Sequence, residues 1–438
     1  MSSELSFDKY IKAIEQLNVN RDIGKVTEVT GFLIRGYVPG ACVGSICEIQ
    51  PLVGKSSFLS EVVGFVDRQV LLMPLGEMKG VGLGARIVLL KSRALVNVGD
   101  HLLGRVINAL GEPIDKHGAI DTIEEYELYN EAKNPLWRPP IDEPLELGIR
   151  SIDTFLTVGK GQRVGVMAGS GVGKSVLLGM MARNTDADIN IIAMIGERGR
   201  EVREFIEHNL SEDALKKSVV IVATSDQSPL LRMRGAFLAC SIAEYFSDNG
   251  QNVLIMMDSV TRFAMAQREI GLNTGEPPAS KGYTPSVFTM LPKLLERAGN
   301  FEGKGSITGL YTVLVEGDDM DDPIADSVRS IVDGHIVLDR NLAQRGHFPA
   351  VDILQSTSRV MKNIVGDNNM DFAKKVRQNI ATYRDAEDLI NIGAYKAGTN
   401  PKIDKAIELH DLIDEFLIQE VNEPSQFKER VQALAQRL

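Results

Sequence analysis

The sequence predicts an α/β protein with a small N-terminal β-barrel, a central domain around a parallel sheet, and a C-terminal helical domain. Three observations predict this: short β-type runs before residue 95, apolar strands that alternate with helices in the middle of the chain, and no strand pattern after residue 366. Such alternation indicates a parallel sheet covered by helices on both faces. The expected boundaries are residues 1–20, 21–95, 96–365 and 366–438.

The first twenty residues form a segment of their own. Their apolar side chains recur at helical spacing among charged neighbours, which predicts an amphipathic helix. Its apolar stripe consists of Phe7, Tyr10, Ile11, Ile14 and Leu17. A stripe of this kind either packs on its own chain or docks a partner.

Short β-type runs at residues 24–29, 32–38, 44–49 and 61–72 follow, punctuated by Gly and Pro. This pattern is typical of a small closed barrel. The glycine-rich stretch at residues 80–84 lies between such runs and opens no helix, so we expect a turn there rather than a nucleotide loop.

Composition excludes several classes of protein. With 438 residues, of which 44% are hydrophobic, the chain can fill sizeable cores and is not a disordered protein. No apolar run approaches the ~20 residues that span a bilayer, and the N-terminus lacks the order of a signal peptide, so we expect a cytoplasmic protein. A net charge of −11 argues against a general nucleic-acid binder.

The central domain is expected to begin with an extended connection at residues 102–116 and 134–144. A helix is expected from Pro229, capped by Ser228, to the stop signal at residues 248–250. Two further helices are expected at residues 174–183 and 200–210. The expected strands lie at residues 163–167, 190–195, 219–223, 253–257, 307–315 and 335–338.

A glycine-rich loop follows the strand at residues 163–167 and opens a helix. Glycines let backbone N–H groups turn toward phosphate oxygens, and the helix N-terminus adds positive charge. Lys174 can then reach the β- and γ-phosphates, while Ser175 can offer its hydroxyl to Mg²⁺. Ala168 stands where the full pattern has Gly. The expected nucleotide-binding residues are Gly169, Ser170, Gly171, Val172, Gly173, Lys174, Ser175 and Val176.

Two carboxylates end strands of the same predicted sheet. Asp258 closes a buried apolar strand, where a carboxylate is costly unless it serves a metal shell, so we expect it to hold Mg²⁺. Glu197 follows the strand at residues 190–195 and could polarise an attacking water. The alternative for Glu197 is a surface residue paired with Arg198 or Arg200. Spacing alone says nothing about Arg359.

Together these residues resemble the rotary-type ATPase family, which includes the ATP synthase catalytic subunits. The signature lies at residues 349–352 and 356–358. Within that family the chain is most similar to the flagellar type III protein-export ATPases, on the phrases at residues 103–113, 168–178, 292–299 and 315–323. The resemblance covers residues 22–438 and implies a RecA-like P-loop ATPase domain in the centre.

The resemblance also implies roles for single residues. Glu197 would be the catalytic glutamate, and Arg359 the arginine finger that reaches a neighbouring subunit's ATP. Arg198 and Arg262 would lie near the phosphates, and Phe348 would stack on adenine. Because one chain carries both Glu197 and Arg359, whereas rings of two subunit types divide them, the comparison points to a ring of identical subunits.

The implied activity is Mg·ATP hydrolysis by a homo-hexamer that energises or primes flagellar protein export. The implied partners are a stator-like regulator at the N-terminal helix, the export gate, secretion chaperones and exported proteins. Through these partners the protein would lie at the inner face of the membrane. Three alternatives remain: the ATPase of a virulence-type secretion system, a non-catalytic ring subunit, which would lack Glu197, and an RNA translocase, for which the barrel offers few basic residues.

Overall fold

The computed structural model describes residues 22–53, 56–122, 124–315, 317, 319–423, 431, 434 and 435. The helix expected at residues 1–20 lies outside these residues. The described chain forms two compact units. One contains the residues up to Leu95 together with Asn273–Gly275, and the other contains the remainder.

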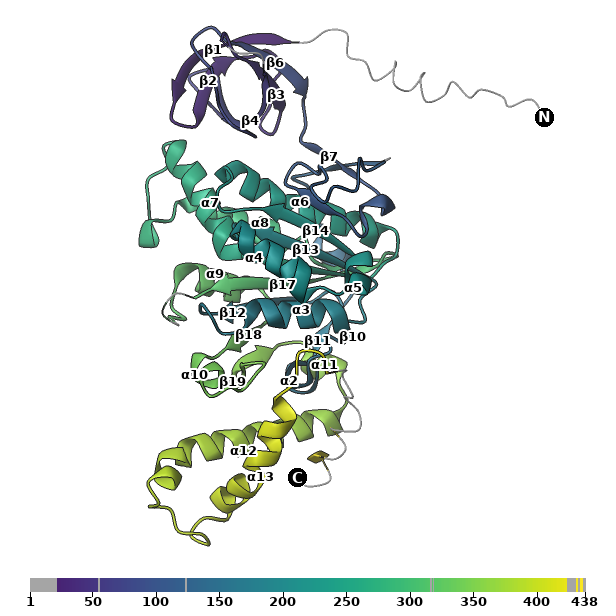
Figure 1. Ribbon diagram of the computed structural model, residues 1–438, viewed down its shortest axis with the longest axis vertical. Helices are drawn as coiled ribbons and strands as arrows, with labels where there is room; N and C mark the ends of the chain where they lie inside the picture. The colour runs from purple at the N-terminus through teal and green to yellow at the C-terminus, as the bar shows by residue number, and fades with distance from the viewer. Residues whose placement is uncertain are drawn as a thin grey trace, which may run out of the picture. The chain divides into compact units, whose positions relative to one another are not determined.

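The first unit is a closed six-stranded barrel, as the sequence predicts (Figure 1). Neighbouring strands follow the order β1-β2-β5-β4-β3-β6. Side chains alternate between core and solvent, and Val26, Ile34 and Ile87 are among those that fill the interior. The strands are β1 (Ile23–Thr30), β2 (Leu33–Tyr37), β3 (Ile46–Gln50), β4 (Phe58–Val66), β5 (Gln69–Pro74) and β6 (Arg86–Lys91).

One expected β-run is a hairpin. The stretch at residues 61–72 is divided between β4 and β5, which pair antiparallel. Asp67 and Arg68 form the turn with φ of 49° and 67°. Positive φ at both central residues matches the twist of the flanking strands, but the sequence lacks the Asn-Gly or Asp-Gly pair that signals such a turn. Residues 80–84 lie in the loop between β5 and β6, as expected.

The second unit is built on a sheet with the strand order β19-β18-β12-β17-β15-β13-β14-β8. These strands pair in parallel, except that β19 runs antiparallel to β18. Both edge strands were missed: β8 lies in the expected connection, and β19 has no local strand signal at its polar end. The strands are β8 (Val106–Asn108), β12 (Arg163–Ala168), β13 (Ile189–Ile195), β14 (Ser218–Ala223), β15 (Val253–Asp258), β17 (Ser306–Leu314), β18 (Gly334–Leu338) and β19 (Val351–Ser358).

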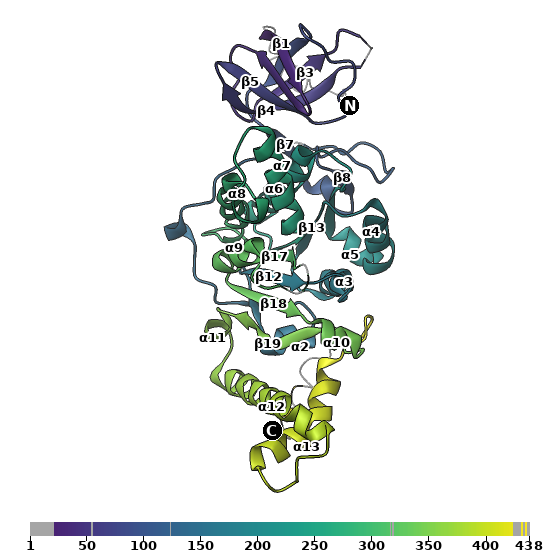
Figure 2. The ribbon, with the colours of Figure 1, turned by 90° about the vertical axis from the view of Figure 1, so that its left-hand side faces the viewer.

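Helices cover both faces of this sheet (Figure 2). On one side lie α3 (Lys174–Asn184), α4 (Gly199–Glu204) and α5 (Glu212–Lys216). On the other lie α6 (Pro229–Asp248), α8 (Pro285–Leu295) and α9 (Pro323–Ile331). The predicted cap of α6 is present, since the Ser228 side chain accepts the N–H of Leu231 at 3.3 Å.

The helix expected at residues 200–210 is α4 followed by a π-helical turn, η3 (Phe205–Asn209). This turn packs closely on α3: a Cβ at Gly179 would lie 2.6 Å from the Cβ of Asn209. Gly179 therefore permits a contact that any side chain there would block, and the apolar spacing of the sequence does not reveal it.

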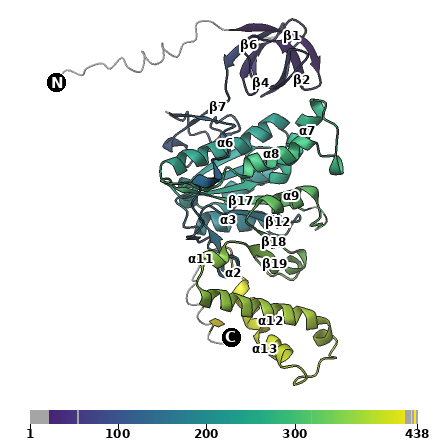
Figure 3. The same ribbon diagram turned by 180° about the vertical axis from the view of Figure 1, so that it is seen from behind.

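After residue 366 the described chain is helical, as expected (Figure 3). The long helices α12 (Asp367–Asn391) and α13 (Pro401–Leu417) pack against each other and against α2 (Arg150–Phe155). Phe155 lies between them, with ring centroids 6.0 Å from Phe372 and 5.9 Å from Phe416. The apolar core of the sheet thus continues into the C-terminal helices.

The remaining elements are short, apart from α7. No helix among the described residues combines the length and apolarity needed to cross a bilayer. These elements are β7 (Leu95–Val98), η1 (Asp100–Leu102), β9 (Glu124–Glu127), η2 (Pro135–Trp137), β10 (Pro144–Leu145), β11 (Val158–Gly159), α7 (Val260–Asn273), η4 (Ser280–Gly282), β16 (Gly299–Asn300), α10 (Arg340–Gln344) and α11 (Met361–Ile364).

Candidate active site

The loop between β12 and α3 has the conformation that the sequence predicts for phosphate binding. Gly171 and Gly173 adopt φ of 78° and 88°, where glycine carries no steric penalty. Gly173 is the N-cap of α3, so the helix N-terminus faces the loop. Loop amides and the helix end together attract a polyphosphate.

Lys174, at the start of α3, lies among carboxylates from two other strands. Its Nζ contacts Oδ1 of Asp258, at the end of β15, and lies 3.7 Å from Oε1 of Glu197, beyond β13. The carboxyl ends of parallel strands share one edge of the sheet, which is why residues so distant in sequence meet here.

Asp258 is almost fully buried and is held by a residue that sequence reasoning missed. Thr312, on the intervening strand β17, donates its hydroxyl to Asp258 Oδ1 at 2.7 Å and is itself buried. Nothing in the local sequence around Thr312 distinguishes it from other strand residues. Only the strand order, with β17 between β12 and β15, gives it this position.

Glu197 is buried, with 7% of the residue exposed. Burial, reinforced by the negative charge of Asp258, raises the pKa of Glu197 to about 7, although Lys174 opposes the shift. The structure does not pair Glu197 with the two neighbouring arginines, which was the surface alternative. Arg198 instead contacts Glu201 at 3.6 Å, and Arg200 contacts Glu204 at 2.7 Å.

The two arginines expected near the phosphates differ in position. The stem of Arg262 lies over Gly196, where an added Cβ would be 2.6 Å from the Cβ of Arg262, and φ is 72°. The buried Nε of Arg262 has no hydrogen-bond partner among the described residues, and its Nη1 donates to Sδ of Met265 at 3.5 Å. Arg198 lies at the surface with its side chain 80% exposed. Arg262 therefore packs beside Gly196, the neighbour of Glu197 in the chain, whereas Arg198 points to solvent.

A cavity of about 410 Å³ opens beside the phosphate loop. Its walls come from the loop and the start of α3, from Phe348 and Pro349, and from the segment after α13. Phe348 is 43% exposed and its ring would lie 3.4 Å from a Cβ at Gly173. An aromatic face in a largely apolar cavity suits a purine base. The contribution of residues 418–421 was not predicted, because nothing in their sequence indicates it.

The donors expected for Mg²⁺ fit that ion. Mg²⁺ prefers hard oxygens and commonly takes one or two protein ligands beside phosphate and water. Ser175 offers a hydroxyl from the exposed first turn of α3, and Asp258 offers a buried carboxylate already oriented by Thr312.

Arg359 is not brought to this cluster. It follows β19, whose last residue, Ser358, pairs with Gly334 at the amino end of β18. Ala168, which precedes the phosphate loop, pairs with Leu338 at the other end of β18. Gly334 and Leu338 are four residues apart along β18, which is about 13 Å at the rise per residue of a strand. Arg359 therefore lies at the end of the sheet where the parallel strands begin, whereas Lys174 of the same chain lies where they end.

A glycine-rich loop between a buried strand and a helix, with its lysine against a strand-end aspartate, defines a P-loop nucleotide-binding protein. Comparison with known proteins shows to which family of P-loop proteins the chain belongs. Residues 148–358 match the ATP synthase alpha/beta family, nucleotide-binding domain, and residues 365–436 match the T3SS EscN ATPase C-terminal domain.

Relatives are similar over nearly their whole length. The flagellum-specific ATP synthase of Bacillus subtilis (strain 168) is 52% identical over 97% of each chain. The type 3 secretion system ATPase of Xanthomonas euvesicatoria is 45% identical over 97% of this chain and 96% of its own. The assembled ATPase EscN with its central stalk EscO, from enteropathogenic E. coli, superposes with a TM-score of 0.88 at 46% identity, covering 94% of this chain and 99% of its own.

The chain therefore belongs to the ATP synthase alpha/beta family, among its flagellar and type III secretion members, and is an ATPase. The barrel and helical C-terminal domain predicted from the sequence pattern, and the RecA-like centre implied by the resemblance, are confirmed.

Proposed function

We propose that the chain hydrolyses Mg·ATP as a homo-hexamer and so energises or primes protein export through the bacterial flagellar apparatus. The observation that carries the catalytic part is the position of Lys174 between Asp258 and Glu197, at the carboxyl edge of the sheet. A phosphate-binding cation, a metal-binding carboxylate and a buried base here converge on one point.

Each residue has a stated task in this proposal. The phosphates of ATP bind to residues 169–176. Lys174 then exchanges its contact with Asp258 for contacts with the β- and γ-phosphates. Mg²⁺ bound by Ser175 and Asp258 would neutralise charge between those phosphates. Glu197, once ionised, accepts a hydrogen bond from the attacking water and polarises that water.

The remaining predicted site residues act around this centre. Arg262, whose buried Nε lacks a partner among the described residues, stabilises charge on the phosphates. Arg198 would have to leave Glu201 to do the same. Phe348 stacks on adenine in the cavity beside the loop. Arg359 serves the site of the next subunit, since it lies at the far edge of its own sheet.

Substituting Glu197 tests the catalytic assignment. Glu197→Gln keeps size and polarity but cannot accept a proton, so Mg·ATP should still bind while turnover falls by ~100-fold or more. Lys174→Ala should lose both binding and turnover. The matched control is Glu204→Gln, an exposed glutamate nearby that pairs with Arg200. Near-normal turnover by Glu197→Gln, with binding measured by a fluorescent ATP analogue, would refute the assignment.

Higher identity to a flagellar relative than to a secretion-system relative favours flagellar export over a virulence-type system. The two can be separated genetically. Expression of this chain in Bacillus subtilis lacking its own flagellum-specific ATP synthase should restore swimming, and the Lys174→Ala chain should not. If an expressed and soluble wild-type chain restores nothing there, but restores secretion in a strain lacking a type 3 secretion system ATPase, the virulence-type alternative replaces the flagellar one.

The assembly and partners belong to the proposal too. The EscN relative has been solved assembled and with a central stalk bound. By analogy we propose a hexamer of this chain that meets a stalk-like and a stator-like regulator, the export gate, secretion chaperones and exported proteins, at the cytoplasmic face of the membrane. The stator-like regulator would dock on the stripe at residues 1–20. Capture of that regulator by an Ile11→Asp, Ile14→Asp double variant would argue against this docking site.

A further inference from the structure

We infer that Gln419 is a positioning residue for the base: it holds the segment after α13 to the central domain and fixes Phe348 beside the base-binding cavity. The inference rests on the proposed stacking of Phe348 on adenine. Gln419 follows the last turn of α13 in sequence, whereas Phe348 precedes β19. The link therefore joins the C-terminal helices to the nucleotide site.

The side chain of Gln419 bonds to one part of the central domain, and its backbone bonds to another. The residue is 3% exposed. Its Oε1 accepts the backbone N–H of Arg150 at 2.9 Å, and its Nε2 donates to the carbonyl of Gly148 at 3.0 Å. Its backbone N–H donates to the carbonyl of Phe348 at 2.9 Å. Since a buried amide that loses its partners costs free energy, these bonds define one position for the segment.

Arg150 fixes the same segment from within the core. Its guanidinium is fully buried; Nε donates to the carbonyl of Phe416 at 2.9 Å, and Nη2 contacts the carbonyl of Ile418. Nη1 donates to Glu423 at 2.7 Å. A buried cation is tolerated only when its donors are matched in this way.

The phosphate-loop helix α3 holds the outer end of the segment. Arg183, in the last turn of α3, donates from Nη2 to the carbonyl of Val421 at 2.9 Å. Residues 418–421, which form a wall of the base-binding cavity, are thus fastened on both sides. This wall is a fixed surface against which Phe348 can be placed.

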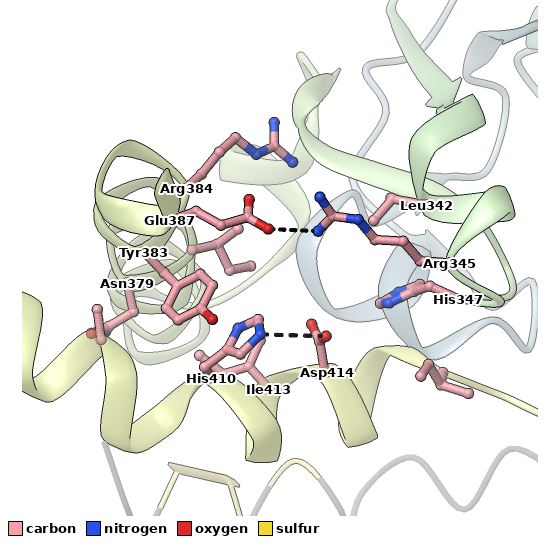
Figure 4. A pocket seen from close by; sticks show the side chains of 13 residues that line it. Leu342, Arg345, His347, Asn379, Tyr383, Arg384, Glu387, His410, Ile413 and Asp414 are labelled. Atoms are coloured by element: carbon pink, nitrogen blue, oxygen red, sulfur yellow. Dashed lines mark hydrogen bonds and ion pairs between the residues drawn. The ribbon is translucent and has the colours of Figure 1, made fainter. Parts of the chain in front are cut away.

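Phe348 is an exposed residue between two buried neighbours, His347 and Pro349. Its ring borders the base-binding cavity, while the preceding residue, His347, borders a second cavity of about 180 Å³ between α10, α12 and α13. Figure 4 shows His347 facing this second cavity opposite His410 and Asp414 of α13. The hydrogen bond from the Gln419 backbone N–H to the Phe348 carbonyl links this residue directly to the segment after α13.

The consequence concerns the base and not the phosphates. Stacking requires the ring to lie parallel to the base at contact distance, so a small displacement of Phe348 weakens it. The phosphate loop and Lys174 belong to β12 and α3, which keep their own contacts. Loss of the Gln419 link should lower affinity for ATP and leave affinity for a polyphosphate without a base unchanged.

The experiment compares Mg·ATP with inorganic tripolyphosphate, which lacks a base, on the full chain. Gln419→Ala should raise the KM for ATP about tenfold, as expected for a lost stacking contact, with kcat nearly unchanged. The inhibition constant of tripolyphosphate should stay at its wild-type value. Gln419→Glu, which keeps the acceptor for Arg150 but not the donor to Gly148, should fall between. Glu415→Ala, an exposed change on α13, is the matched control.

A double substitution separates this inference from the function on which it rests. In a Phe348→Ala background, Gln419→Ala should add no further rise in KM, because both act through one contact. If Phe348→Ala alone leaves the KM for ATP unchanged, the stacking role is wrong. If Phe348→Ala raises KM but Gln419→Ala does not, or if Gln419→Ala weakens tripolyphosphate equally, only the positioning role is overturned. Should Gln419→Ala fail to fold, Gln419→Glu decides by the same measurements.

Discussion

Glu197 differs from an ordinary surface glutamate because its environment opposes ionisation. It is buried beside the negative charge of Asp258, and its pKa is raised to about 7. A base with a pKa near the working pH combines a large ionised fraction with useful proton affinity. The sequence indicates only that a carboxylate ends a strand; the pKa follows from how closely β13 and β15 bring two carboxylates together.

This environment predicts a pH dependence. Only ionised Glu197 can polarise water, so kcat/KM for ATP should rise with pH through about 7 and then level off. Glu201 also raises the pKa of Glu197. Glu201→Gln should therefore move the rising limb to lower pH, whereas Glu204→Gln should leave it in place. A flat wild-type profile between pH 5.5 and about 8, measured at subsaturating ATP, would contradict the role of Glu197 as base.

At the scale of elements, the sequence predicted those helix and strand boundaries that neighbouring residues determine. Ser228 and Pro229 specified the start of α6, because a cap and a fixed φ act within one turn. The edge strand β8 was missed because its partner β14 lies more distant in the chain, and β19 because its polar end carries no apolar strand pattern although it pairs with β18. The π-helical turn η3 was also missed; it packs on α3 at Gly179, a contact that the apolar spacing of the sequence does not indicate.

The β4–β5 hairpin offers a test of backbone strain. Arg68 adopts φ of 67°, a region that costs a non-glycine residue about 1 kcal/mol or more. Arg68→Gly relieves this strain, of roughly 1–2 kcal/mol, but adds the ~0.5–1 kcal/mol entropic cost of glycine, so the barrel should gain a net ~0.5–1 kcal/mol, read as slower hydrogen exchange of the β4 and β5 amides. The same change at Arg86, an exposed residue of β6, should destabilise the barrel by ~0.5–1 kcal/mol. Equal effects of both substitutions would show that strain at the turn is not responsible.

At the scale of the whole molecule, the sequence predicted those residues of the candidate site that belong to a local motif or a strand end. Lys174 was predicted from the glycine-rich loop that opens a helix, and Asp258 and Glu197 from their positions at the carboxyl ends of strands. Thr312 and Gln419 were not, since their roles depend on the strand order and on the return of the chain after α13. Arg359 was assigned only by resemblance, and its place at the far edge of the sheet gives that assignment a geometric reason.

Arg359 carries a prediction about assembly. The backbone at Arg359 lies about 13 Å along the sheet from the level of its own phosphate loop, so in the proposed ring we expect Arg359 to serve the site of another copy of the chain. Arg359→Ala should retain nucleotide binding and lose on the order of a thousandfold in kcat, as removal of an arginine finger does. Specific activity of the wild type should rise steeply with protein concentration, since isolated chains have incomplete sites.

Mixing two inactive variants tests the same idea without relying on affinity. Arg359→Ala chains have an intact Lys174, and Lys174→Ala chains have an intact Arg359. In a mixed ring of equal parts, random placement pairs an intact loop with an intact finger at about a quarter of the interfaces, so activity should return to a comparable fraction. As the control, Lys174→Ala chains that also carry Arg359→Ala should restore nothing to the Arg359→Ala chains. If the variants co-assemble, shown by tagged pull-down, and no ratio recovers turnover, then Arg359 does not act between subunits, and each chain must complete its site by other residues.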